Sequence, residues 1–117
     1  MNHYVIVALG SNTNPEQNIS VASDELAGLL HSCHFSHTIW TYDIHHTCVK
    51  YLNRLVAGYT DMTVDELDEK LKTIENLHHR SRHEVTIDLD LMQYDGVRYH
   101  LKDWPRPYIQ RLINEIE

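Results

Sequence analysis

The order of apolar and polar residues predicts strands and helices in alternation along the first half of the chain. Residues 4–9 are apolar and largely β-branched and lead into Gly-Ser-Asn, which predicts a buried strand followed by a turn. Asn14 and Pro15 are a typical helix start, and apolar residues at helical spacing then predict about four turns of helix. A second strand is predicted over 36–41, and the polar, histidine-rich stretch 42–50 indicates a loop.

The second half begins with a segment, 51–59, whose pattern fits either a helix or a strand. Thr63 and Glu66 are spaced as a capping box, and the apolar face behind them predicts a helix that ends near Leu77. Residues 85–92 alternate strictly, which is typical of a strand with two different faces. One face carries Val85, Ile87, Leu89 and Leu91, and the other carries Asp88 and Asp90.

The end of the chain predicts a hairpin and a closing helix. Asp95 and Gly96 form a hairpin turn signal, and residues 108–116 indicate a short helix after a proline-rich break. The order β-α-β-β-α-β predicts an α+β sandwich, with two helices on one face of a mainly antiparallel sheet. We find no linker or repeat, so residues 1–117 are expected to form a single domain.

Composition is ordinary for a globular protein, at 42% hydrophobic and 23% charged residues. The formal charge of −7 argues against a nucleic-acid partner, and no run is apolar and long enough for a membrane span or a signal peptide. Cys33 and Cys48 form no CxxC pattern, so reduced thiols and a cytoplasmic location are expected. The sequence does not indicate the oligomeric state.

Two clusters of charge suggest phosphate chemistry. Asp88 and Asp90 share one strand face, where Mg²⁺ would offset their repulsion, although a solvated outer face of an edge strand is the simpler explanation of the pattern alone. Arg80 and Arg82 lie just before them and suit phosphate binding, whereas cations at a helix C-terminus are the simpler interpretation. Six of the ten Lys and Arg residues follow Leu77.

The ten histidines raise a rival hypothesis, a zinc site. Its spacing matches no common closed zinc site. The candidate ligands are His45 and His46 with Cys48, and His78 and His79 with His83.

Several short motifs occur in an order that identifies a family. They are Ala-Leu-Gly-Ser-Asn at 8–12, Tyr-Leu-Asn at 51–53, Ile-Glu at 74–75, Arg-x-Arg at 80–82 and Ile-Asp-Leu-Asp-Leu at 87–91. Together the motifs resemble 6-hydroxymethyl-7,8-dihydropterin pyrophosphokinase, an enzyme of folate biosynthesis, from residue 4 to about 111. The resemblance implies a ferredoxin-like α/β sandwich, with 51–59 as a strand.

The resemblance also implies an activity, the Mg²⁺-dependent transfer of pyrophosphate from ATP to the pterin hydroxymethyl group with release of AMP. Two Mg²⁺ ions would be held by Asp88 and Asp90, with Asp88 also near the pterin. The family roles carried over are Arg80, Arg82 and Arg111 for ATP and its phosphates, and Thr41, Tyr51 and Asn53 for the pterin.

The sequence departs from the family pattern around the ATP site. Tyr42 is followed by Asp-Ile instead of a proline-rich segment, and the loop between Arg82 and Asp88 is short, with Val85 at a usual arginine position. Arg106 stands where the family has histidine, and the sequence ends early. The alternative hypothesis is therefore a weakened paralogue that binds pterin or nucleotide without transfer.

Overall fold

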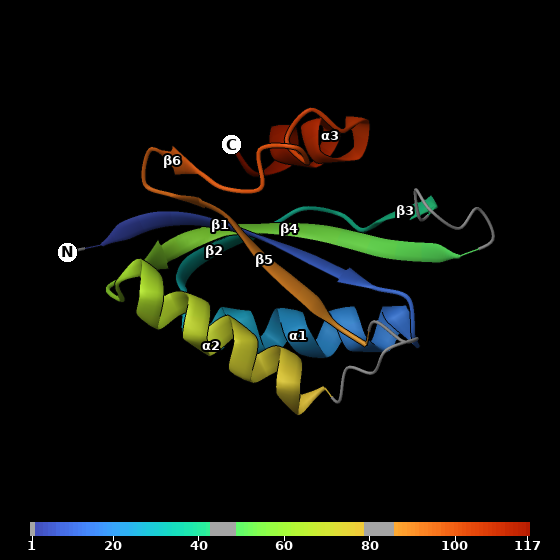
Figure 1. Ribbon diagram of the computed structural model, residues 1–117, viewed down its shortest axis with the longest axis horizontal. Coiled ribbons are helices and arrows are strands. Elements are labelled where there is room, and N and C mark those ends of the chain that lie inside the picture. Colours follow the sequence, from blue (N-terminus) through green and yellow to red (C-terminus); the bar gives the residue numbers. More distant parts are fainter. Residues whose placement is uncertain (1, 43–48, 79–85) are drawn as a thin grey trace.

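The computed structural model describes residues 2–42, 49–78 and 86–117. Figure 1 shows the chain as a sheet with helices on both sides. In chain order the elements are β1 (His3–Ser11), α1 (Pro15–Leu29), β2 (His31–Phe35), β3 (Ile39–Tyr42), β4 (Lys50–Thr60), α2 (Val64–Leu77), β5 (Asp88–Tyr94), β6 (Val97–Arg98) and α3 (Pro107–Ile116).

The sheet is antiparallel at every described pairing and has the order β2-β4-β1-β5-β6, with β3 also paired to β4. β1 is therefore central, with β4 on one side and β5 on the other. The core β1-α1-β2-β4-α2-β5 is the ferredoxin-like order of two interleaved βαβ units. This confirms the α+β class, and β4 confirms that the ambiguous segment 51–59 is a strand.

The helices divide the molecule into three layers (Figure 1). α1 and α2 pack on one face of the sheet, where Leu26 and Leu67 meet strand residues such as Val7 in a single apolar core. α3 packs on the opposite face, where Ile109 and Leu112 belong to a second core. The expectation of two helices on one face was therefore incomplete, because the amphipathic closing helix covers the other face.

The two helix starts differ in how they are capped. At α2 the predicted capping box is present: Glu66 N donates to Thr63 Oγ1 at 3.2 Å, and Thr63 N donates to Glu66 Oε1 at 3.0 Å. Asn14 does precede α1, but its backbone is left-handed, with φ 41°, and its side chain makes no capping bond.

None of the helices in the described ranges has the length and apolarity needed to cross a membrane.

The strand predicted over 36–41 is wrong in its bounds, since two short strands, β2 and β3, flank Ser36. Ser36 N donates to Leu55 O at 2.9 Å, but Leu55 N donates to Ser36 Oγ at 2.9 Å instead of to a backbone carbonyl. A side chain thus replaces one step of the ladder and interrupts the strand. β2 reads His-Ser-Cys-His-Phe and lacks the apolar alternation that would have predicted it.

β5 has the two faces that its alternation predicts, although it begins at Asp88 and not at 85. Leu89 and Leu91 are buried toward α1 and α2. Met92, on the aspartate side, is buried toward α3. The hairpin predicted at Asp95 and Gly96 joins β5 to β6. Val85 lies outside the described residues.

Candidate active site

A hollow of about 240 Å³ opens on the α3 face of the sheet. It lies at the end of β1, and five parts of the chain contribute to its wall: β1, β3, β4, β5 and the stretch that leads into and begins α3. The lining residues are Ala8, Leu9, Gly10, Thr41, Tyr42, Tyr51, Asn53, Arg54, Leu55, Asp88, Asp90, Asp103, Arg106 and Tyr108.

The register of the three central strands explains why the sheet is hollowed here. Gly10 in β1 lies opposite Asn53 in β4 and opposite Asp88 in β5. Glycine has no side chain, so the floor between the amide and the carboxylate stays low. A Cβ on Gly10 would lie 3.6 Å from Asn53 Oδ1, which is ordinary van der Waals contact. The amide and the carboxylate therefore face the same space across one residue of β1.

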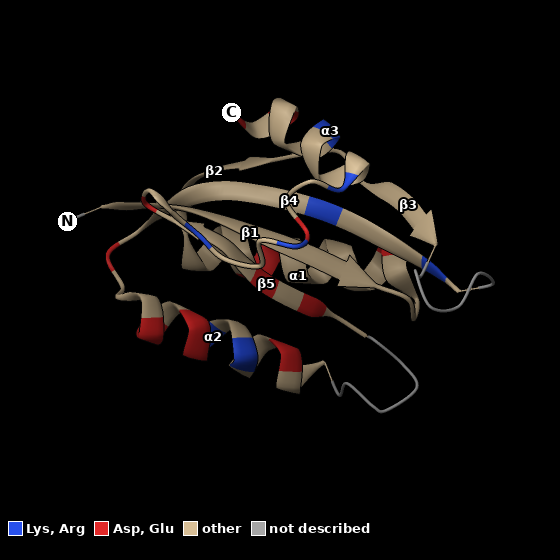
Figure 2. Cartoon of the chain, turned by 45° about the horizontal axis from the view of Figure 1, so that its top comes forward, with Lys and Arg blue, Asp and Glu red and all other residues tan. Residues whose placement is uncertain are grey.

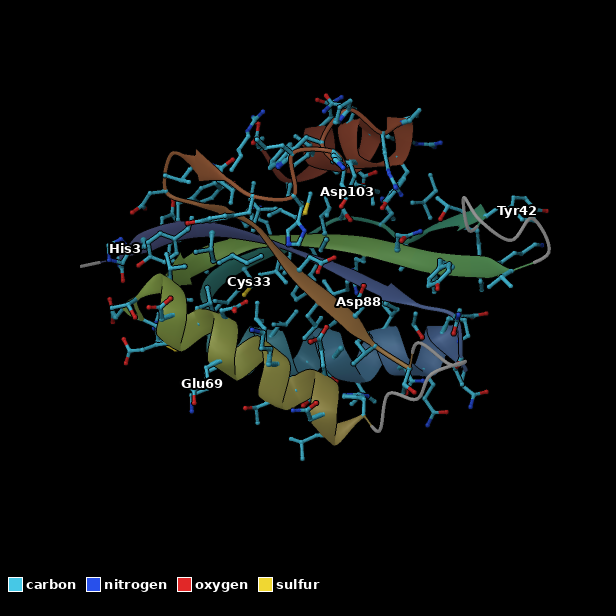
Figure 3. The ribbon with its side chains drawn as sticks, in the orientation of Figure 1. His3, Cys33, Tyr42, Glu69, Asp88 and Asp103 are labelled. Atoms are coloured by element: carbon cyan, nitrogen blue, oxygen red, sulfur yellow. The ribbon has the colours of Figure 1, made fainter. Side chains whose placement is uncertain are left out.

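The two aspartates stand on this face as their spacing predicts. Both are partly exposed, and residues two apart in a strand are roughly 7 Å apart. Asp88 is labelled in Figure 3 on β5. Asp90 lies opposite Ala8, and its Oδ1 is 3.8 Å from His100 Nε2. Hard carboxylate oxygens at the rim of a polar hollow are donors that fit Mg²⁺.

Asn53 is buried, with 8% of its surface exposed, and its amide orientation is fixed by its neighbours. Asn53 Nδ2 donates to Thr41 Oγ1 at 2.8 Å and to the carbonyl oxygen of Ile39 at 3.2 Å. A carbonyl only accepts, so the NH₂ group must face β3 and Oδ1 must face Gly10 and the hollow. Asn53 thus presents a fixed acceptor, and Thr41 helps to orient it.

The stretch from Asp103 to Tyr108, which includes the start of α3, supplies three lining residues to which the sequence motifs gave no role. Arg106 Nε is 3.2 Å from Asp103 Oδ1, and Arg106 N donates to Asp103 O at 3.0 Å. Burial raises the pKa of Tyr108, and the charge of Asp103 raises it further against the lowering effect of Arg106. Asp103 is labelled in Figure 3. Their only sequence signal is the Pro-Arg-Pro run at 105–107, which places Pro107 at the first position of α3.

The structure thus brings five of the eight predicted site residues into one hollow: Thr41, Tyr51, Asn53, Asp88 and Asp90. Arg111 is exposed on α3 and is not among the described lining residues. Arg80 and Arg82 lie outside the described residues, so their predicted phosphate contacts stay predictions.

The described residues give no support to the zinc hypothesis. In residues 2–42, 49–78 and 86–117, no three His, Cys, Asp or Glu side chains group so that they could hold a metal ion. His78 Nε2 instead lies 2.7 Å from Glu25 Oε1, which ties α2 to α1. The Cys33 thiol is free, and burial raises its pKa. The other candidate ligands, His45, His46, Cys48, His79 and His83, lie outside the described residues.

Comparison with known proteins decides the family. Residues 6–114 match the model of 7,8-dihydro-6-hydroxymethylpterin-pyrophosphokinase. The chain belongs to this pyrophosphokinase family. The match covers all three helices and every residue that lines the hollow, apart from the last residues of α3. Membership of the family implies pterin pyrophosphokinase activity, a kinase-type transfer in folate biosynthesis. No curated protein matches the chain.

Proposed function

We propose that this chain transfers pyrophosphate from ATP to the hydroxymethyl group of 6-hydroxymethyl-7,8-dihydropterin and releases AMP. The observation that carries the proposal is the juxtaposition, across Gly10, of the Asn53 amide and the Asp88 carboxylate. One group suits a hydrogen-bonding heterocycle, and the other suits the cation that accompanies a polyphosphate. The hollow therefore offers one suitable group to each of the two substrates.

The pterin would occupy the side of the hollow next to β3 and β4. Asn53 Oδ1 would accept a hydrogen bond from the N–H edge of the ring, and Thr41 holds the amide in that orientation. The partly exposed Tyr51 would flank the ring. A volume of about 240 Å³ lies below the usual range for ligand sites, roughly 300–1,000 Å³. It therefore suits a bicyclic ring whose phosphate partner extends to the surface.

The phosphate side of the hollow is the one next to β5. Asp88 and Asp90 would hold Mg²⁺, for which one or two carboxylates with phosphate oxygens and water complete the usual shell. Bound there, the ions would neutralise charge on the transferring phosphoryl groups. The family resemblance leads us to propose two ions. Asp88, opposite Gly10 and hence near Asn53, would lie closest to the pterin.

The transfer itself balances without an additional reactant. The pterin hydroxyl oxygen forms a bond to the β-phosphorus, and the bond from that phosphorus to the α,β-bridging oxygen breaks. AMP leaves with the bridging oxygen, and the hydroxyl proton is released. The chain contributes by holding both groups in line, which is the main source of catalysis in phosphoryl transfer. Arg106, at the rim, would stabilise phosphate charge, as would Arg80, Arg82 and Arg111.

A second candidate function is binding of pterin or nucleotide without transfer. One contact favours it: Arg106, a cation that lines the hollow, is 3.2 Å from Asp103 and is thus partly neutralised. In this case pterin affinity would be measurable by calorimetry while AMP would not form.

The deciding experiment measures AMP from ATP, Mg²⁺ and the hydroxymethyl-dihydropterin. We expect AMP and the pyrophosphorylated pterin in equal amounts, with neither product when the pterin is omitted. Asp24→Asn, an exposed change on α1, serves as the matched control and should retain full turnover. Absence of AMP at high enzyme concentration would refute the transfer reaction, and pterin binding under the same conditions would favour the second candidate.

A further inference from the structure

Glu75 belongs to the Ile-Glu motif at 74–75, to which the proposed site gives no role, and it contacts β5 from the side opposite the hollow. It lies in the last turn of α2, on the opposite face of the sheet from the hollow. Glu75 Oε2 accepts a hydrogen bond of 2.8 Å from Leu89 N. Leu89 is the residue between Asp88 and Asp90, so a helix side chain holds the peptide between the two carboxylates.

This contact occurs where β5 lacks a second strand neighbour among the described residues. β1 pairs with β5 from Asp88 to Tyr94, whereas β6 pairs only with Gln93 and Tyr94. On the open edge of β5, a main-chain N–H would otherwise lack a strand partner. The half-buried Glu75 carboxylate supplies the acceptor, and buried Leu89 keeps the bond away from bulk water.

The position of this bond determines what it controls. Asp88 is the first residue of β5, and among the described strands it pairs only with β1. Fixing Leu89 N fixes the peptide plane next to Asp88 and thereby the direction in which both aspartate side chains leave the strand. Hydrogen bonds outside a metal's own ligands orient those ligands elsewhere in proteins, and here the bond is made to the main chain that carries them.

We propose that Glu75 is a positioning residue for the cation-binding pair Asp88 and Asp90, and that it acts as a hydrogen-bond acceptor through the backbone of Leu89. The inference rests on the proposed function for the role of the two aspartates. It makes a specific claim: acceptor geometry at position 75 matters, and its negative charge does not.

Three substitutions separate these two properties. Glu75→Gln keeps an acceptor oxygen at the same reach and removes the charge. Glu75→Asp keeps the charge and shortens the reach. Glu75→Ala removes both. Glu69→Ala is the matched control, because Glu69 is exposed on the outer side of the same helix (Figure 3) and loses the same charge.

The readout is Mn²⁺ affinity, measured by electron paramagnetic resonance in the presence of an ATP analogue with a methylene group between the α- and β-phosphorus. We expect Glu75→Ala and Glu75→Asp to weaken Mn²⁺ binding by about 10-fold, as loss of a second-sphere partner typically does. Glu75→Gln and Glu69→Ala should stay close to wild type. Hydrogen exchange should show the Leu89 amide exchanging faster in the Ala and Asp variants only.

Opposite patterns would overturn the proposal. If Glu75→Asp bound Mn²⁺ like wild type and Glu75→Gln bound it like Glu75→Ala, Glu75 would act through its charge. If Leu89 exchanged faster in Glu75→Ala with Mn²⁺ affinity unchanged, the bond would be structural only. No Mn²⁺ binding by wild type would also refute it. Should Glu75→Ala fail to fold, the Gln and Asp pair still gives the answer. The AMP assay on wild type tests the proposed function separately, because it does not depend on this residue.

Discussion

The same strands present two very different faces to the helices. On the α1/α2 face, two long helices cover the sheet and their buried apolar side chains form one continuous core with it. On the α3 face, a ten-residue helix that begins only at Pro107 covers the sheet around Ile6 and Met92. The part near Gly10 is left to polar side chains. Figure 2 marks the acidic residues of β5 in red.

This difference shows how a small domain combines stability with a site. A fully covered sheet would bury Asp88 and Asp90 away from water, and burying a carboxylate is strongly unfavourable. Because α3 is short, these groups stay at a partly open surface, while the other face provides an uninterrupted core. Alternate side chains of β5 point to opposite faces of the sheet. One set packs in the core, and the other set includes the two aspartates that line the hollow.

The largest expected effect, on the rate of AMP formation, comes from the two aspartates on the α3 face of the sheet. Asp88→Asn and Asp90→Asn remove a charge from the cation-binding pair while keeping side-chain size. We expect AMP formation to fall by about 100-fold or more in each, since loss of metal-based charge stabilisation is worth several kcal/mol. Steady-state turnover measures this, and thermal melting should show little change in stability. Near-normal turnover in either variant would show that its carboxylate does not bind the cation.

The next pair of substitutions removes the same side-chain volume from the core on each face of the sheet. Leu67 in α2 and Leu112 in α3 are buried, with 0% and 1% exposed. Changing either to Ala should lower the free energy of unfolding by about 2–5 kcal/mol. Below the melting temperature Leu67→Ala should keep its pterin affinity, whereas Leu112→Ala should lose some, because α3 carries Tyr108 into the hollow. Urea unfolding and calorimetry test the pair. Equal affinity losses would contradict the separation of the faces.

A smaller change fills the hollow directly. Gly10→Val adds two methyl groups beyond the Cβ position that already lies 3.6 Å from Asn53 Oδ1. We expect pterin affinity to fall by about 10-fold, a usual cost for misfit of one or two carbon atoms in a pocket. Gly10→Ala should bind more nearly like wild type. Calorimetric titration with the pterin measures both, and unchanged affinity in Gly10→Val would place the pterin elsewhere.

The smallest effect concerns the far end of β1, away from the hollow. His3 Nδ1 lies 2.7 Å from Asp95 Oδ2, and Tyr4 N donates to Asp95 Oδ1. The hydrogen bond with His3 holds the pKa of Asp95 below its ordinary 3.8, with the backbone bond adding to the effect. A lowered carboxyl pKa contributes stability that is complete above pH 3.8 and lost as pH falls through the folded-state value.

Thermal melting of wild type and Asp95→Asn checks this prediction. We expect the difference in melting temperature between the two proteins to shrink as the pH is lowered below about 4, because the wild-type carboxylate then becomes protonated. Turnover at neutral pH should be equal in both, since this pair does not line the hollow. A difference in melting temperature that is constant over this range would mean that the His3 contact does not stabilise the charged form.

Local patterns predicted the parts of the fold that local chemistry determines. The capping box at Thr63 and the strict alternation around Asp88 and Asp90 depend on neighbours two to four residues away, and both are present. β2 was not predicted because its polar residues are held by pairing with β4, a contact across more than twenty residues. The third helix was predicted but its face was not, since strand alternation does not say which helix covers which side.

The site also contains residues that the sequence predicted and residues that only the structure reveals. Asn53 and Thr41 were predicted from the family resemblance, and the structure adds a direct contact between them, a 2.8 Å hydrogen bond that links β3 and β4. Asp103 and Tyr108 were missed because they reach the hollow only through the path of the chain between β6 and α3. Glu75 stood in a motif, but its bond to Leu89 depends on how α2 packs against β5.

The central claim is that the hollow beside Gly10 holds both substrates, and one measurement tests it most directly. Backbone amide shifts are recorded by NMR while the pterin, Mg²⁺ and the methylene analogue of ATP are added. We predict that the largest changes occur at Gly10, Asn53 and Asp88, with small changes at Leu26 inside the α1/α2 core. Changes that instead centre on the cavity beside His37 and Glu115, with Gly10 unaffected, would contradict it.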